Sequence, residues 1–188
     1  MKTNRVVATA FVLTAVAFAQ ATNPPTVNQR RENQQDRIAN GIDSGQMTAG
    51  ETKSVEAREA NLNREIHDDR QANGGNLTAG ERAQVNAQQN RISNRIYADK
   101  HNANVAHYGN NEVGRRRENQ QDRIAYGVRN GSLRAGQTAP LENHEQGINQ
   151  QIHADRTANG GKLTAQQHAQ INREQNRTSR NIYRAKHS

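Results

Sequence analysis

The sequence predicts an all-α protein built from two tandem three-helix units, each made of helix–loop–helix hairpins. Three observations lead to this prediction: a long internal repeat, a recurring helix-start pattern, and apolar residues at helical spacing. Residues 30–102 and 116–188 align without a gap at an offset of 86, with 40 of 73 positions identical. The string RRENQQDRIA occurs at 30–39 and again at 116–125. A repeat of this length defines the structural unit.

The first residues are typical of a secretion signal. Lys2 and Arg5 precede an apolar stretch over residues 6–18, which ends in the small-residue pattern Ala-Phe-Ala at 17–19. We therefore expect residues 1–19 to be a cleaved signal peptide of a bacterial type and residues 20–29 to be an N-terminal linker. The apolar stretch is too short for a spanning helix and no second one follows, so we expect a periplasmic or secreted protein that does not span a membrane.

The composition lies between those of a helical globular protein and a disordered chain. Apolar residues make up 31% and aromatic residues 3%, the formal net charge is +8, and Cys is absent. An exported chain of this kind has no disulfide to stabilise it. The periodicity of its apolar residues has to decide between order and disorder, and it favours helices.

Four short segments carry the pattern Gly-x-Leu-Thr-x-x-Glu or a close variant of it, beginning at positions 45, 75, 131 and 161. The glycine supplies a positive φ after the end of the preceding helix. Threonine acts as the N-cap of the next helix, and Glu or Gln three residues later completes a capping box. We predict N-caps at Thr48, Thr78 and Thr164; the equivalent position in the third segment is Arg134.

Large apolar residues follow each cap at helical spacing. Val55, Leu62 and Ile66 are separated by seven and four residues, and the other long helices repeat these steps. A seam this regular indicates helices that pack along narrow stripes. The helices are expected near residues 28–41, 50–72, 79–101, 115–127, 137–158 and 165–187, with the helical repeats at 30–102 and 116–188 and a linker at 103–115.

Each repeat offers about ten large apolar side chains, a thin core for its length. We therefore expect either that the two repeats support one another or that the protein forms a homo-oligomer.

The four loops are similar to EF-hand loops without the calcium ligands. If Glu51 is placed at loop position 12, Gly45 occupies position 6, as that loop requires. Positions 1 and 3 are then Asn40 and Ile42, and an isoleucine supplies no side-chain oxygen. Glu51 and Glu81 are thus the weak metal candidates, and no cofactor is expected; Ca²⁺ or Zn²⁺ binding stays open as an alternative.

The same loops resemble the motif that names the Spy/CpxP/ZraP group of periplasmic stress proteins, Leu-Thr-x-x-Gln. Residues 163–167 match it fully, and residues 77–81 match it with Glu in place of Gln. The resemblance implies an exported, all-helical protein that binds unfolded clients or senses envelope stress.

The arginines of the repeated string are the predicted interaction surface, because both repeats keep them while neighbouring positions change. They are Arg30, Arg31 and Arg37 in the first repeat, and Arg116, Arg117 and Arg123 in the second. Acidic residues lie between these arginines and no aromatic platform for stacking bases exists, so we expect no nucleic-acid partner. Ion pairing along the opening helix is the alternative interpretation.

No nucleophile–base pair, metalloprotease motif or paired-carboxylate arrangement is evident, so we expect no enzyme. Three functions stay open. The first is a non-enzymatic exported protein that contacts envelope or unfolded proteins, as a stress adaptor or chaperone. The second is a divalent-cation-binding, EF-hand-like protein. The third is a structural protein that self-assembles in the envelope or outside the cell.

Overall fold

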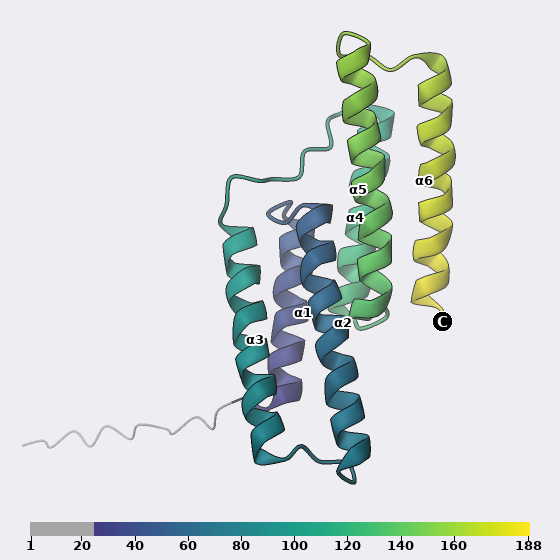
Figure 1. Ribbon diagram of the computed structural model, residues 1–188. Helices are drawn as coiled ribbons and strands as arrows, with labels where there is room; N and C mark the ends of the chain where they lie inside the picture. The colour runs from purple at the N-terminus through teal and green to yellow at the C-terminus, as the bar shows by residue number, and fades with distance from the viewer. Residues whose placement is uncertain (1–24) are drawn as a thin grey trace, which may run out of the picture.

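The computed structural model describes residues 25–188 as six α-helices, with no strand in that part of the chain (Figure 1). The helices are α1 (Val27–Asp43), α2 (Ala49–Ala72), α3 (Ala79–Lys100), α4 (Glu112–Arg129), α5 (Ala135–Ala158) and α6 (Ala165–Lys186). The all-α prediction is confirmed. The predicted signal peptide and residues 20–24 of the predicted N-terminal linker lie outside the described residues. The rest of that linker contains the N-cap Thr26 and the first residues of α1, so the helix begins inside the segment expected to be a linker.

Capping side chains fix where the helices begin. Thr48, Thr78 and Thr164 occupy the N-cap positions that the sequence predicts, and each closes a capping box with the Glu or Gln three residues later. Arg134 is different, because its side chain accepts no capping bond; instead the Gln137 side chain accepts a hydrogen bond from the Arg134 backbone N–H at 2.9 Å. The glycines that precede these caps all have positive φ, as a chain leaving a helix requires.

Helix α4 begins three residues earlier than the sequence predicts, inside the segment expected to be a linker. Asn111 is its N-cap, and the Asn111 side chain accepts a hydrogen bond from the backbone N–H of Gly114 at 2.9 Å. An asparagine-rich segment is compatible with a loop or with a helix cap, so composition alone placed this boundary wrongly. The segment between α3 and α4 is correspondingly shorter.

The two repeats pack against each other through equivalent helices. Helix α2 lies against α5 and α1 lies against α4, while α3 and α6 flank this central group on opposite sides (Figure 1). Gly50 faces Gln146, and Gly136 faces Ala60. Because these two contacts are related by the repeat offset of 86, the repeats are arranged about an approximate two-fold axis, with α2 antiparallel to α5.

One hydrophobic core extends across both repeats. It joins Ile38, Val55 and Val85 of the first repeat to Ile124 and Leu141 of the second, all 4% exposed or less. A smaller cluster lies among α4, α5 and α6 and includes Val113, Ile148 and Ile171. Of the two ways to support a thin core that the sequence left open, the structure therefore shows mutual support between the repeats. Among residues 25–188, no helix has the length and apolar character needed to cross a membrane.

Gly147 tests how far helix propensity limits stability. It lies exposed in the middle of α5, and a Cβ at this position would meet nothing within 4 Å. Gly147→Ala should raise the free energy of unfolding by about 1 kcal/mol, because alanine loses less backbone entropy in a helix. Urea unfolding measures the change.

The contrasting variant is Gly127→Ala. A Cβ at Gly127 would lie 2.7 Å from Cγ and Cδ1 of Leu133, a side chain that is 1% exposed. This substitution should lower the free energy of unfolding despite the same gain in helix propensity. Equal gains from both variants would contradict the packing described for the α4–α5 loop.

Candidate interaction surfaces and the buried carboxylates

The repeated string RRENQQDRIA lies largely inside the molecule, where its glutamines connect helices. The Gln34 side chain is 2% exposed and donates to the backbone carbonyl of Gln89 at 2.8 Å; the Gln89 side chain in turn donates to the carbonyl of Val27 at 2.8 Å. The second repeat has the same arrangement, with Gln120 donating to the carbonyl of Gln175 at 2.7 Å. Each pair fastens the opening helix of a repeat to its last helix.

The arginines of the string also bond within the chain. Arg37 donates to the hydroxyl and the carbonyl oxygen of Ser93 at 3.2 and 3.0 Å, and Arg123 does the same to Ser179 at 2.9 and 3.1 Å. The first arginine of each string also bonds to the last helix of its repeat: Arg30 donates to the Asn90 side chain, and Arg116 donates to the Asn176 side chain.

The retention of this string in both repeats therefore has a structural explanation. Helix-to-helix bonds account for its glutamines and for four of the six arginines predicted as an interaction surface. These four arginines bond mainly to Asn and Ser on α3 or α6. Ion pairing along the opening helix, the alternative interpretation, occurs at Arg116, whose guanidinium lies 4.0 Å from a carboxylate oxygen of Glu112. Contact of these arginines with a partner stays a prediction.

The other two arginines, Arg31 and Arg117, lie next to buried carboxylates. They occupy equivalent positions in the two repeats, but Arg117 is 7% exposed and Arg31 is half-buried. The positive charge of Arg31 acts on Glu59, and that of Arg117 acts on Glu145. Their exposure differs because Tyr108, from the segment between α3 and α4, lies over the guanidinium of Arg117.

Four glutamates are buried where α2 meets α5. Glu56, Glu59 and their equivalents Glu142 and Glu145 are all 1% exposed or less. Gln35 donates to Glu56 at 3.2 Å, and its equivalent in the second repeat donates to Glu142 at 3.0 Å. Both oxygens of Glu59 and of Glu145 lack a hydrogen-bond partner among the described residues.

Burial shifts the titration of these carboxyls upward, because a charged carboxylate loses its hydration in the interior. Burial raises the pKa of Glu56 to about 8, and that of Glu59 and Glu145 to about 7, the last two opposed by the nearby arginine charges. Burial also raises the pKa of Glu142, and the negative charges of Glu145 and Glu56 raise it further. Glutamates of the two repeats therefore repel one another across the interface when ionised.

The sequence-based search missed this cluster, although a signal was present. Glu56 and Glu59 are identical in both repeats, and they lie on the helical face of Val55 and Leu62. A charged residue type suggested solvent exposure, and a single sequence does not show that another helix covers the same face. Their retention at a buried spacing in both repeats was the available clue.

The weak metal candidates serve as helix caps. One oxygen of Glu51 accepts from the backbone N–H of Thr48 at 2.9 Å, and the other accepts from the Asn102 side chain at 2.7 Å. Glu81 accepts from the N–H of Thr78 at 2.8 Å and from the Asn73 side chain at 2.9 Å. Within residues 25–188, no three His, Asp or Glu side chains come together in a group that could hold a metal ion.

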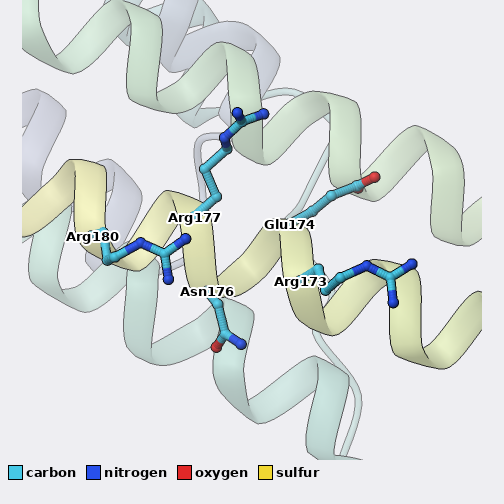
Figure 2. Close-up of a pocket in the computed structure, with 5 residues that line it drawn as sticks. All are labelled: Arg173, Glu174, Asn176, Arg177 and Arg180. Atoms are coloured by element: carbon cyan, nitrogen blue, oxygen red, sulfur yellow. The ribbon is translucent and has the colours of Figure 1, made fainter.

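Helix α6 presents an exposed basic surface, which we call the α6 arginine face: Arg173, Arg177 and Arg180. The three side chains extend from successive turns of the helix and line a shallow hollow of about 380 Å³ together with Asn176 and Glu174 (Figure 2). Among the described residues, none of these three arginines lies within 4.0 Å of a carboxylate oxygen. Their charges are directed at solvent, so this surface can attract an acidic partner.

No protein-family model, curated protein or solved structure matches this chain.

The buried carboxyls predict that stability falls as the pH rises. Their folded-state pKa values lie above 4.5, the ordinary value, so the folded chain binds more protons than the unfolded chain between about pH 4.5 and 8. Each such carboxyl lowers the free energy of unfolding by up to about 1.4 kcal/mol per pH unit in that window. Urea unfolding should show a loss on the order of 3 kcal/mol or more between pH 5 and pH 8.

The double variant Glu56→Gln with Glu142→Gln provides the control. Glutamine keeps the shape and an acceptor for the donors from α1 and α4 but does not ionise, so stability should depend less steeply on pH. A wild-type protein that is equally stable at pH 5 and pH 8 would contradict the burial of these carboxyls.

Proposed function

We propose that this is an exported, non-enzymatic protein that acts by contacting other proteins of the cell envelope through the α6 arginine face. A stress adaptor or chaperone that binds unfolded, acidic client segments is the most concrete form of this function. The observation that carries the proposal is the set of exposed arginines on α6 that form no ion pair among the described residues.

Comparison of the repeats separates this surface from the requirements of folding. At the positions equivalent to Arg173 and Arg180, helix α3 has Ala87 and Asn94, whereas Arg177 corresponds to Arg91. Four buried positions of α3 and α6 correspond, at 85, 89, 92 and 96 in α3 and at 171, 175, 178 and 182 in α6; only α3 buries a fifth, Asp99. The extra arginines therefore change the surface of α6 while its packing seam stays in place.

The chemistry of arginine suits a protein partner with exposed carboxylates. A guanidinium group offers a planar set of donors that pairs with a carboxylate through two hydrogen bonds. Several such groups on one helix also raise the rate of encounter with an acidic partner, an effect that salt screens. Client binding through this face should thus be fast and sensitive to ionic strength.

The test is suppression of aggregation of an acidic client protein as it unfolds. The mature protein, residues 20–188, should suppress light scattering at a near-stoichiometric ratio, and Arg177→Glu with Arg180→Glu should reduce suppression at least fivefold. The matched control is Arg82→Glu with Arg91→Glu, which makes the same change in net charge on exposed positions of α3.

The control variant should suppress aggregation as well as the wild type does. Equal losses in the two double variants would assign the effect to net charge and contradict the α6 face as the contact surface. No suppression by the wild type at several-fold excess would contradict the chaperone function itself.

A further inference from the structure

The two repeats differ in what covers the loop between their first two helices. In the first repeat, residues 102–110 of the connecting segment run across the α1–α2 loop towards α4. Ala106 donates its backbone N–H to the carbonyl of Gly45 at 2.8 Å. The ring of Tyr108 lies over the guanidinium of Arg117, with 5.2 Å between the arginine Cζ and the ring centroid. The connecting segment thus occupies a groove formed by the α1–α2 loop and α4.

This segment fits closely in its groove. A Cβ at Gly114 would collide with the backbone carbonyl oxygens of Tyr108 and Gly109. Tyr108 itself is half-buried, and its ring accounts for the low exposure of Arg117 compared with Arg31. A cation over a partly desolvated ring is attracted by the negative face of the ring. The chain therefore contains one occupied example of a groove that binds an extended segment.

The equivalent groove, around the α4–α5 loop, is open. It has a volume of about 860 Å³ and lies between that loop and helices α1 and α2. Its walls include Arg31, Gly131 and Gln137, the equivalents of Arg117, Gly45 and Glu51 in the covered groove. We call it the open groove.

Gly131 shows the difference directly. Its φ of 74° matches the 69° of Gly45, so the two loops have the same local conformation. A Cβ at Gly45 would lie 3.4 Å from the carbonyl oxygen of Ala106, whereas a Cβ at Gly131 would meet nothing within 4 Å. The backbone acceptor and the arginine that hold the connecting segment in one repeat are thus both present, and uncovered by residues 25–188, in the other.

We propose that the open groove binds an extended segment of a partner protein, with an aromatic side chain over Arg31 and a backbone N–H donated to the carbonyl of Gly131. This site lies on α1, α2 and the α4–α5 loop, so it goes beyond the contact surface proposed on α6. Its recognition chemistry is that of the connecting segment: an extended backbone, a short run of small residues, and a tyrosine.

The lining of the groove favours a peptide over a simple anion. Arg64 and Arg134 add positive charge, but Glu32 and Asp36 lie in the same walls. Val128, in the last turn of α4, and Leu133, in the α4–α5 loop, also line the groove, and their aliphatic side chains offer no anion ligand. Mixed charge with apolar surface suits a segment that presents backbone donors, backbone acceptors and a ring.

The first experiment uses a peptide with the sequence of residues 102–110, blocked at both ends and labelled with a fluorophore. The connecting segment is held by a short tether, which gives it an effective concentration in the millimolar range. A free peptide lacks this advantage, so the titration should extend to several millimolar protein or peptide. Anisotropy and NMR shifts should show saturable binding to the mature protein. Arg31→Ala should weaken binding at least fivefold, and a peptide with alanine in place of its tyrosine should bind at least fivefold more weakly. Arg82→Ala, at an exposed position of α3 outside the groove lining, should change nothing.

The second experiment does not depend on Arg31, which also faces Glu59. Residues 103–110 are added after Ser188, the position equivalent to Asn102, so that the tail can reach the open groove. Gln137, which lines the groove, already donates to the Ser188 hydroxyl at 2.9 Å. The tail should raise the melting temperature and reduce peptide binding at least tenfold. A control tail with alanine in place of the tyrosine should do neither.

Several outcomes would overturn the proposal. One is a peptide that binds only after Tyr108→Ala has loosened the connecting segment, because it would then occupy the covered groove. Another is a mature protein that is dimeric by light scattering and becomes monomeric in Arg31→Ala, because a second copy would then fill the open groove. Equal competition by inorganic phosphate would indicate an anion site, and no saturable binding at several millimolar would exclude a peptide site.

Discussion

The antiparallel packing of α2 against α5 is the contact on which the rest of the molecule depends. It joins two thin sets of apolar side chains into one core, with Val55 and Leu141 both nearly inaccessible to solvent. It also encloses Glu56 and Glu142, which are stable there only as neutral acids or beside positively charged groups. The contact therefore sets the core, the titration behaviour and the relative positions of the two loops.

The same axis explains why the repeats pair with each other. Asp43 and Arg129 are equivalent positions, and they form an ion pair at 3.1 Å where α1 meets α4. Self-pairing of either repeat about a similar axis would instead bring two aspartates or two arginines together. An exposed pair contributes little to stability, but like charges at that place disfavour the alternative pairing. The divergence of this position thus selects the arrangement seen within one chain.

The helices and their caps could be predicted from local chemistry, whereas the contacts between distant helices could not. Thr48 could be assigned as a cap because its partner lies three residues away, and the seam of Val55 and Leu62 follows from helical spacing alone. The burial of Glu56 depends on α5, some 80 residues further along the chain. The hydrogen bond from Gln34 to the carbonyl of Gln89 depends on another distant helix, α3, in the same way. A single sequence shows that these residues are repeated, but it does not show the helix contacts that explain the repetition.

The asymmetry of the two grooves connects the proposed surfaces. A covalent connection between the repeats has to cross one of the two equivalent loops, and it covers the α1–α2 loop while the α4–α5 loop stays open. Gln137 lines the open groove and donates to the carbonyl of Ala185 in the last turn of α6 at 2.9 Å. A segment that leaves the open groove past Gln137 therefore reaches α6 directly. Tandem duplication thus turns a symmetric pair into a molecule with one internal segment and one free groove, next to the helix that carries the additional arginines.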